Sequence, residues 1–332
     1  MKRLKIVFVV GSLLIASVVH SAELRAGIIG LDTSHVLAFT KALNAEKPEP
    51  GYAGVRVTVA YPKGSPDIES STKRVPGYTE KVKAMGVEIV GSIDEMLTKC
   101  DVVFLESNDG RPHLEQAIPV FKAGKPVFID KPVAGTLAQC IALYDAAARY
   151  KVPMFSASSL RYTVKMNEIG SDKYGPVKGA LTYGPCALEK THPDLFWYGI
   201  HGVEMLFTLM GPGCESVVRT SSPAADVVTG IWDDGRIGTF RGNRNCKYNF
   251  GGSAFFDKSV QNIDDYKGYG MLLEEIVKFF KSGEVPVSAE ETIAIFAFME
   301  AADESKRQGG IPVKIADVIA KARVEAKNMR VE

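Results

Sequence analysis

The stretch "GIIGLDTSH", residues 27–35, decides the fold of this chain. An apolar strand runs into a turn at Gly30 and a helical pattern follows, as in the first unit of a dinucleotide-binding domain. Such units space three glycines as G-x-G-x-x-G, so that backbone can approach a pyrophosphate and the helix can pack on the strand. Here Asp32 stands at the second glycine position and His35 at the third. A carboxylate would repel a pyrophosphate, so the turn alone leaves cofactor binding open.

Short apolar strands and helices alternate from residue 24 to about 158. This alternation predicts an α/β fold with a Rossmann-like, doubly wound parallel sheet, in which ligands bind beyond the carboxyl ends of the strands. The side chains of Asp32, Thr33 or Ser34 are candidates to cap the first helix. The strand of residues 55–61 ends without the acid that usually binds ribose hydroxyls, and Lys63 suits either a 2′-phosphate or solvent.

After residue 170 strands follow one another, which predicts a C-terminal α+β domain with an open antiparallel sheet. One helix, over residues 196–211, should pack on this sheet, and further helices are expected at 268–282, 289–307 and 316–327. The predicted domains are a Rossmann-like domain at 23–158, an α+β substrate and oligomerisation domain at 159–285, and C-terminal helices at 286–332 that pack back on the first domain.

The first 22 residues have the layout of a secretory signal peptide. A basic start, "MKRLK", precedes an apolar run of 14 residues, and Ala22 is the expected last residue before cleavage. A membrane span needs about 20 residues, so we expect no stable membrane insertion after cleavage; a buried first strand or an uncleaved anchor are the alternatives. The sequence therefore predicts an exported protein, periplasmic or secreted.

Composition excludes several classes of function. The net charge of +1 gives no basic surface for nucleic acid, so no nucleic-acid partner is expected. The five cysteines are far apart and form no C-x-x-C motif, so no metal site is expected.

Four segments together resemble the Gfo/Idh/MocA family of sugar-type oxidoreductases, in order over about residues 24–315. The most specific feature is Asp130-Lys131-Pro132, which matches the family's Glu-Lys-Pro. The resemblance implies that Lys131 lies near the reacting carbon, where an ammonium can hydrogen-bond the substrate hydroxyl and help to move its proton. The segments are "NDGRPHLEQA" (108–117), "AGKPVFIDKPVAGTLAQC" (123–140), "GIHGVE" (199–204) and "KFFKSGEVPVSAEETI" (278–293).

His201 matches the histidine of the family's Asp-x-Gly-x-His helix, and the resemblance implies a catalytic role for it beside Lys131. Trp197 replaces the family's aspartate, and Glu204 stands where a second acid is common. On one helix, Trp197, His201 and Glu204 would share a face, which suits a sugar-binding surface. Arg161 and Tyr162 resemble a step that lines the family's substrate cleft.

The resemblance also implies NAD or NADP as cofactor. Glu106-Ser107 departs from the family's commoner Thr-Pro and adds a carboxylate near this site. The residues expected to contact the cofactor are Gly27, Gly30, Asp32, Thr33, Ser34, His35, Ser107, Asn108, His113 and Asp130.

Two functions follow from these observations. The first is an enzyme, an NAD(P)-dependent oxidoreductase that transfers a hydride to or from a sugar, cyclitol or related polyol. Because free nucleotide should be scarce outside the cytoplasm, such an exported enzyme would hold its cofactor tightly and recycle it internally. The alternative is a redox-silent exported sugar-binding protein on the same scaffold. In either case, an exposed sheet face predicts a homo-oligomer.

Overall fold

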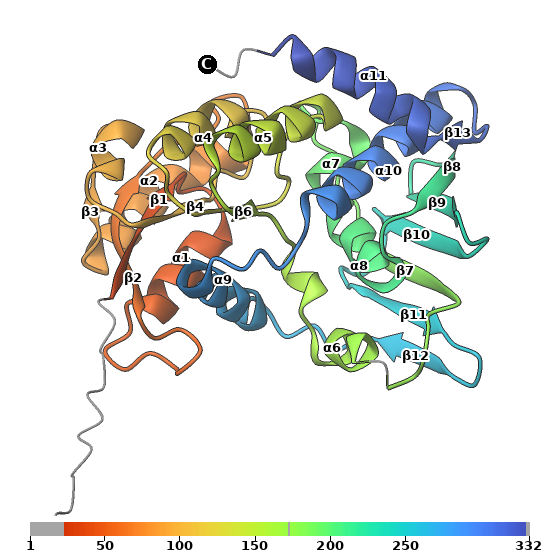
Figure 1. Ribbon diagram of the computed structural model, residues 1–332, viewed down its shortest axis with the longest axis horizontal. Helices are drawn as coiled ribbons and strands as arrows, with labels where there is room; N and C mark the ends of the chain where they lie inside the picture. The colour runs from red at the N-terminus through yellow and green to blue at the C-terminus, as the bar shows by residue number, and fades with distance from the viewer. Residues whose placement is uncertain (1–22, 172, 330–332) are drawn as a thin grey trace, which may run out of the picture.

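A parallel sheet of six strands, ordered β3-β2-β1-β4-β5-β6, forms the N-terminal domain at the left of Figure 1. The structure, a computed structural model, describes residues 23–171 and 173–329, so the expected leader at 1–22 lies outside the described residues. The strand order reverses between β1 and β4, which puts the topological switch point at their carboxyl ends. The strands are β1 (Leu24–Ile29), β2 (Val55–Tyr61), β3 (Glu88–Ile89), β4 (Val102–Leu105), β5 (Val127–Ile129) and β6 (Met154–Phe155).

Helices cover both faces of this sheet. Helices α3, α4 and α5 share one apolar core with it, and α1 and α9 share another on the opposite face. Because helices cover both faces, the central strands are largely apolar, and all four residues of β4 are buried. The helices are α1 (Ser34–Leu43), α2 (Glu69–Ala84), α3 (Ile93–Leu97), α4 (His113–Lys122), α5 (Leu137–Tyr150) and α9 (Gly270–Ser282).

Gly30 allows β1 and β4 to end side by side. Its φ of +88° lies in the left-handed region, and a Cβ there would come within 2.5 Å of the Ser107 backbone nitrogen. The chain then enters α1, whose N-cap is Thr33. The expected side-chain cap is absent: Thr33 makes no capping hydrogen bond, the Ser34 hydroxyl lies 2.9 Å from the Tyr269 hydroxyl, and Asp32 bonds elsewhere.

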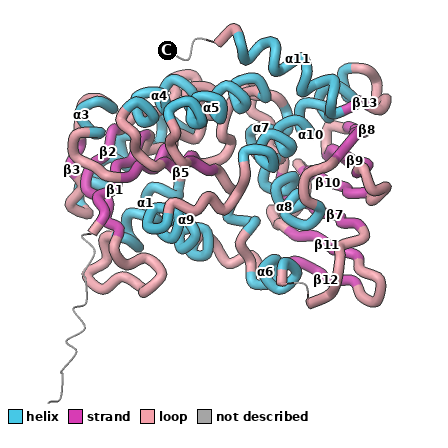
Figure 2. The backbone as a smooth tube through the Cα atoms, viewed as in Figure 1, coloured by secondary structure: helices cyan, strands magenta, loops and turns pink. Residues whose placement is uncertain are grey.

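The second sheet is mixed, and the expectation of a wholly antiparallel sheet was wrong in this detail. Its order is β12-β11-β7-β10-β9-β8-β13, and β7 pairs with β10 in parallel. The chain leaves β7 for two helices and two further strands before it returns beside β7, so the pair cannot be a hairpin. Figure 2 shows these strands gathered on one side of the molecule. They are β7 (Gly179–Pro185), β8 (Cys214–Ser221), β9 (Ala225–Trp232), β10 (Ile237–Asn243), β11 (Gly251–Phe255), β12 (Val260–Ile263) and β13 (Val313–Lys314).

The helix expected over residues 196–211 is two helices, α7 (Asp194–Trp197) and α8 (Ile200–Met210). The break lies at Tyr198 and Gly199, where a Cβ on Gly199 would come within 3.0 Å of the Leu195 carbonyl oxygen. Trp197 and His201 therefore do not share one continuous helix face as predicted.

The last helices join the two domains. Helix α10 packs on both β8 and α5, and α11 packs on α5, along the top of Figure 1. Helix α9, which we placed in the second domain, contributes its buried residues to the core of the first sheet. Among the described residues, no helix is long and apolar enough to cross a membrane. The remaining elements are η1 (Ser159–Arg161), α6 (Val164–Gly170), α10 (Ala289–Arg307) and α11 (Ile315–Lys327).

Candidate functional site

A cavity of about 360 Å³ lies at the carboxyl ends of β1, β4 and β5, where the two domains face one another. The first domain contributes its strand ends and the start of α1, and the second contributes α7, α8 and the loops around β11. The lining residues are Thr33, Ser34, His35, Ser70, Arg74, Asn108, Asp130, Lys131, Ser159, Leu160, Ala187, Trp197, Tyr198, His201, Tyr248, Phe250, Tyr266 and Tyr269.

Lys131 enters this cavity from the end of β5, as predicted from the Asp-Lys-Pro turn. Its backbone N–H donates to Oδ1 of Asp130 at 2.8 Å, which holds the turn. Its ammonium lies 5.9 Å from the centre of the Tyr198 ring, within the range of a cation–π contact. The lysine thus bridges from the first domain toward the second.

His201 lines the same cavity from α8, in the second domain. Its Nδ1 lies 2.7 Å from the Ser158 hydroxyl, a residue that the sequence did not single out. Burial and then the positive charge of Lys131 hold the pKa of His201 well below its usual value. Both causes favour the neutral imidazole, and Lys131 lines the same cavity.

Three buried ionisable groups, His35, Glu106 and Asp130, lie close together, and His35 and Asp130 line the cavity. Nδ1 of His35 lies 3.1 Å from Oδ2 of Asp130 and 3.8 Å from Oε2 of Glu106. Burial, and next the charge of Asp130, raise the pKa of Glu106 well above its usual value. Burial also opposes ionisation of Asp130, but His35 and Lys131 outweigh it and hold the Asp130 pKa below its usual value.

Asp32 lies beneath the cavity and does not line it. It is fully buried; its Oδ1 accepts the backbone N–H of Asn108 at 2.9 Å and its Oδ2 accepts the Ser71 hydroxyl at 2.7 Å. Burial is the main cause that raises the pKa of Asp32 to about 6. Arg74 of α2 donates to the Asp32 carbonyl oxygen at 3.1 Å. The carboxylate therefore ties the turn after β1 to the start of α2.

The path that a dinucleotide usually takes along the sheet edge is closed by the chain itself. The backbone N–H of Leu31 donates to the Lys63 carbonyl at 3.3 Å, and the Ser65 hydroxyl donates to buried Asp109 at 2.6 Å. Outside them, Arg111 pairs with Asp67 at 2.8 Å. No residue of β2, whose end normally meets the adenosine ribose, lines the cavity. A dinucleotide laid along this edge would have to displace these contacts.

Arg161 and Glu204 form a buried ion pair outside the cavity. Nε of Arg161 lies 3.0 Å from Oε1 of Glu204, and its Nη2 lies 2.7 Å from Glu291 of α10. Arg161 and Tyr162 line a separate shallow hollow. The structure thus separates these three predicted substrate contacts from Trp197, which does line the cavity.

Several predicted cofactor contacts hold the strand ends together instead of lining the cavity. His113 is fully buried, with its ring nitrogens 2.8 Å from the Ser107 carbonyl oxygen and 3.2 Å from that of Val133. The Ser107 hydroxyl donates to Gln116 at 3.0 Å. A Cβ on Gly27 would come within 2.9 Å of the Cys100 sulfur, so this glycine permits core packing.

The aromatic wall of the cavity was missed in the sequence. Tyr198, Tyr248, Phe250, Tyr266 and Tyr269 all line it. Four of them come from residues 248–269: Tyr248 and Phe250 lie just before β11, and Tyr266 and Tyr269 lie between β12 and α9. These closely spaced aromatic residues were the sequence feature from which an aromatic wall could have been predicted.

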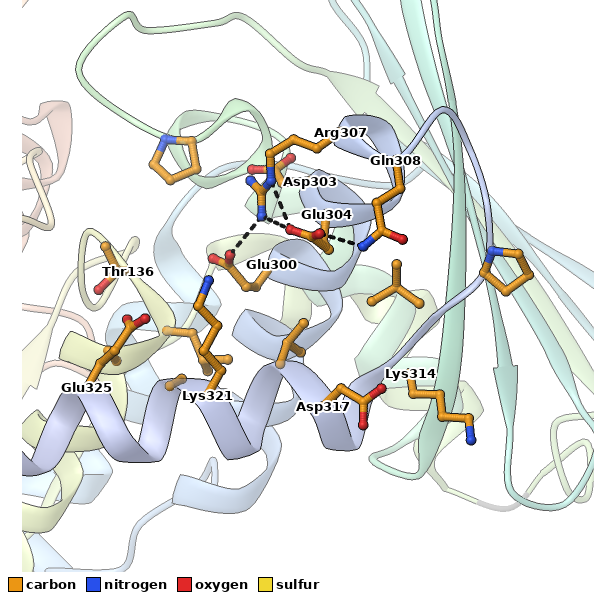
Figure 3. A pocket seen from close by; sticks show the side chains of 17 residues that line it. Thr136, Glu300, Asp303, Glu304, Arg307, Gln308, Lys314, Asp317, Lys321 and Glu325 are labelled. Atoms are coloured by element: carbon orange, nitrogen blue, oxygen red, sulfur yellow. Dashed lines mark hydrogen bonds and ion pairs between the residues drawn. The ribbon is translucent and has the colours of Figure 1, made fainter.

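A larger hollow of about 640 Å³ lies between α10 and α11, on another part of the molecule (Figure 3). Some of its polar side chains pair with one another: Arg307 reaches Glu304 and lies 3.4 Å from Glu300, and Gln308 donates to Glu304 at 2.5 Å. It contains none of the predicted site residues, so we place the site in the smaller cavity.

Residues 24–158 match a family model described as "Oxidoreductase family, NAD-binding Rossmann fold". The predicted resemblance to the Gfo/Idh/MocA family is thereby confirmed for this N-terminal domain. A search of curated proteins finds no match.

Solved structures share the whole fold. The scyllo-inositol dehydrogenase of Lactobacillus casei, solved with NAD(H) and scyllo-inositol, superimposes with a TM-score of 0.71 at 14% identity, over 88% of this chain and 99% of that one. The myo-inositol 2-dehydrogenase of Lactobacillus plantarum gives 0.70 at 15% identity, over 88% and 99%. An Agrobacterium radiobacter oxidoreductase, in complex with NAD+, L-tartaric acid and magnesium, gives 0.68 at 14% identity, over 90% and 100%. The predicted two-domain α/β architecture is thereby confirmed.

Proposed function

We propose that the protein binds a sugar, cyclitol or related polyol in the cavity, with one hydroxyl group between Lys131 and His201. The observation that carries this proposal is the meeting of these two side chains, from different domains, in one cavity. A cavity of about 360 Å³ falls within the range of small-ligand pockets.

The aromatic wall supports a carbohydrate ligand. Rings of Tyr198, Phe250 and Tyr266 present apolar faces on which a sugar ring can stack, and phenol hydroxyls can bond its hydroxyl groups. The inositol dehydrogenases of the same fold act on ligands of this class, which favours a cyclitol or sugar here.

The two polar groups suit proton transfer at a hydroxyl. A neutral His201 can accept a hydroxyl proton, because its pKa lies below its usual value. The Lys131 ammonium can donate a hydrogen bond to the same oxygen and stabilise negative charge that develops there. Each role needs only residues of this chain.

A second candidate is NAD(P)-dependent hydride transfer on the same class of substrate, with a cofactor that is held and recycled. The family match and the NAD(H)-bound neighbour favour it. It requires the segment that includes Ser65 and Ser71 to leave Asp109 and Asp32, so that a dinucleotide could enter. Adenine absorbance in the supernatant of denatured protein would identify such a cofactor.

The test of the lead proposal is binding of sugars and cyclitols, followed by quenching of Trp197 fluorescence. We expect Lys131→Met to weaken binding of the best ligand about 10-fold or more, because it removes a charged hydrogen-bond donor. Lys122→Met, at an exposed position on α4, is the matched control and should bind normally. Equal affinity of the Lys131→Met variant and the parent protein would remove Lys131 from the site.

We also propose that the protein is exported, on the signal-peptide layout of residues 1–22. Mass spectrometry of the protein from its native cells should find a chain that begins at Glu23. A full-length chain in the cytoplasmic fraction would contradict this proposal.

A further inference from the structure

Three buried side chains, two of which line the cavity, bring polar atoms close together. His35 comes from the first turn of α1, Glu106 follows β4 and Asp130 follows β5. One atom from each lies within 4.8 Å of the other two. These strand ends meet at the switch point, so residues far apart in the sequence become neighbours.

The atoms that face one another lack hydrogen-bond partners. Nδ1 of His35, Oδ2 of Asp130 and Oε1 of Glu106 are all buried and unpartnered. His35 is only 4% exposed and both carboxylates are 0% exposed. The 3.1 Å approach of His35 to Asp130 is not a well-directed hydrogen bond. Because buried polar atoms are almost always satisfied, three such atoms around one point indicate a missing ligand.

We propose that His35, Glu106 and Asp130 bind one divalent metal ion of the zinc and manganese class. Bond lengths of about 2.0–2.2 Å place neighbouring ligand atoms roughly 3–3.6 Å apart, close to the 3.1 Å between Nδ1 of His35 and Oδ2 of Asp130. An imidazole nitrogen favours a transition metal over calcium or magnesium, which prefer oxygen ligands. Two carboxylates balance the charge of a dication.

The neighbouring hydrogen bonds orient the proposed ligands. The Thr33 hydroxyl donates to Oε2 of Glu106 at 3.1 Å, and the Lys131 backbone N–H donates to Oδ1 of Asp130 at 2.8 Å. These contacts leave the other carboxylate oxygen of each residue free for the ion. Outer contacts of this kind fix ligand orientation in metal sites.

The proposed ion would be open to the cavity. His35 and Asp130 both line the cavity beside Lys131, and three protein ligands leave positions for a substrate oxygen. An ion there would polarise a hydroxyl or carbonyl oxygen of the ligand. This inference goes beyond the proposed function, which requires no metal. The proposed metal site could not be predicted from ligand spacing in the sequence, because each of its three residues follows a different strand.

The charge of Lys131 also acts on both carboxylates without any metal. The test therefore measures the metal alone. The protein is stripped with a chelator and titrated with Zn²⁺ and with Mn²⁺ by calorimetry, and bound metal is counted by mass spectrometry. We expect one ion per chain.

Four variants locate the ion. Glu106→Gln and Asp130→Asn keep the shape of each side chain and should weaken binding about 100-fold or more. Thr33→Val should weaken it about 10–100-fold, and Thr33→Ser should restore it. Glu88→Gln, at an exposed carboxylate on the sheet edge, is the control and should bind as the parent does.

Thermal unfolding gives a second readout that does not depend on activity. Metal should raise the Tm of the parent protein and leave that of Glu106→Gln unchanged, because an ion stabilises only a chain that binds it. Circular dichroism of each variant checks that it is folded. Absence of a bound ion in the parent would overturn the proposal. So would binding that survives in folded Glu106→Gln and Asp130→Asn.

Discussion

Asp32 is the residue that distinguishes the turn after β1 from a glycine-rich phosphate-binding turn. In the sequence it placed a charge where a pyrophosphate would lie, but in the structure it bonds inward to Asn108 and Ser71. The same contacts bring the start of α2 over the turn. The carboxylate of Asp32, which stands at a glycine position of the phosphate-binding motif, thus links the turn after β1 to the start of α2.

The raised pKa of Asp32 makes the stability of the protein depend on pH. Folding favours the protonated form, so the stabilising effect is full below about pH 4 and is lost as pH rises through about 6. A shift of this size corresponds to about 3 kcal/mol. We expect the Tm of Asp32→Asn, relative to the parent, to rise between pH 4 and 8. A constant difference across that range would show that Asp32 titrates normally.

Arg161 should matter for stability more than for ligand binding. Arg161→Met leaves Glu204 and Glu291 without their partner, and breaking a buried pair costs about 3–5 kcal/mol. Arg25→Met, which breaks an exposed pair with Asp101, should cost about 1 kcal/mol or less. Urea unfolding of both variants measures the difference. Equal losses would mean that the Arg161 pair is not buried in solution.

Motifs in the sequence predicted Lys131 and His201 because each sits in a short, ordered pattern. Glu106 was visible only as a departure from such a pattern. Ser158 and Tyr198 could not be predicted, since their roles depend on how the domains meet and on the break between α7 and α8. Contacts between residues of different domains produce no periodic pattern in the local sequence, so the sequence does not reveal them.

At the scale of elements, patterning predicted several segments to the residue. The strand at 55–61 and the helix at 289–307 match β2 and α10, because alternation and a Ser288 cap mark their limits. The strands β12 and β13 were missed: they are four and two residues long, too short for alternation to register. The parallel pairing of β7 and β10 depends on how the chain connects distant strands. The local sequence pattern contains no information about such connections.

Packing of α8 on the second sheet depends on Gly202. A Cβ at this position would lie 2.2 Å from Phe240, which is fully buried. We expect Gly202→Ala to lower the free energy of unfolding by about 1–3 kcal/mol through overpacking. Gly77→Ala, in α2 with no atom near, should instead raise it by up to about 1 kcal/mol. Denaturant unfolding of both variants tests the contact, and a neutral Gly202→Ala would contradict it.

At the scale of the whole molecule, the outer face of the second sheet carries an apolar row. Ile231 pairs with Ile237 and Phe255 pairs with Val260, and all four are exposed. The expected homo-oligomer would cover this row. We predict that light scattering gives a multiple of the chain mass and that Ile237→Glu shifts it toward the monomer. Val324→Glu, at an exposed residue of α11, is the control. A monomeric parent protein would contradict the prediction.

The two domains share one cavity, and its chemistry comes from both. The first domain has kept the strand order of a dinucleotide-binding sheet while its own residues close the groove along the edge. The family's scaffold is present, and we predict that these contacts exclude a dinucleotide from the edge of the sheet.

Titration of the purified protein with NAD+ and NADP+ by calorimetry measures whether a dinucleotide can enter along the edge of the sheet. We predict no saturable binding at millimolar nucleotide, while a sugar or cyclitol that fits the cavity still binds. Stoichiometric binding of either nucleotide would contradict the account and restore hydride transfer as the function.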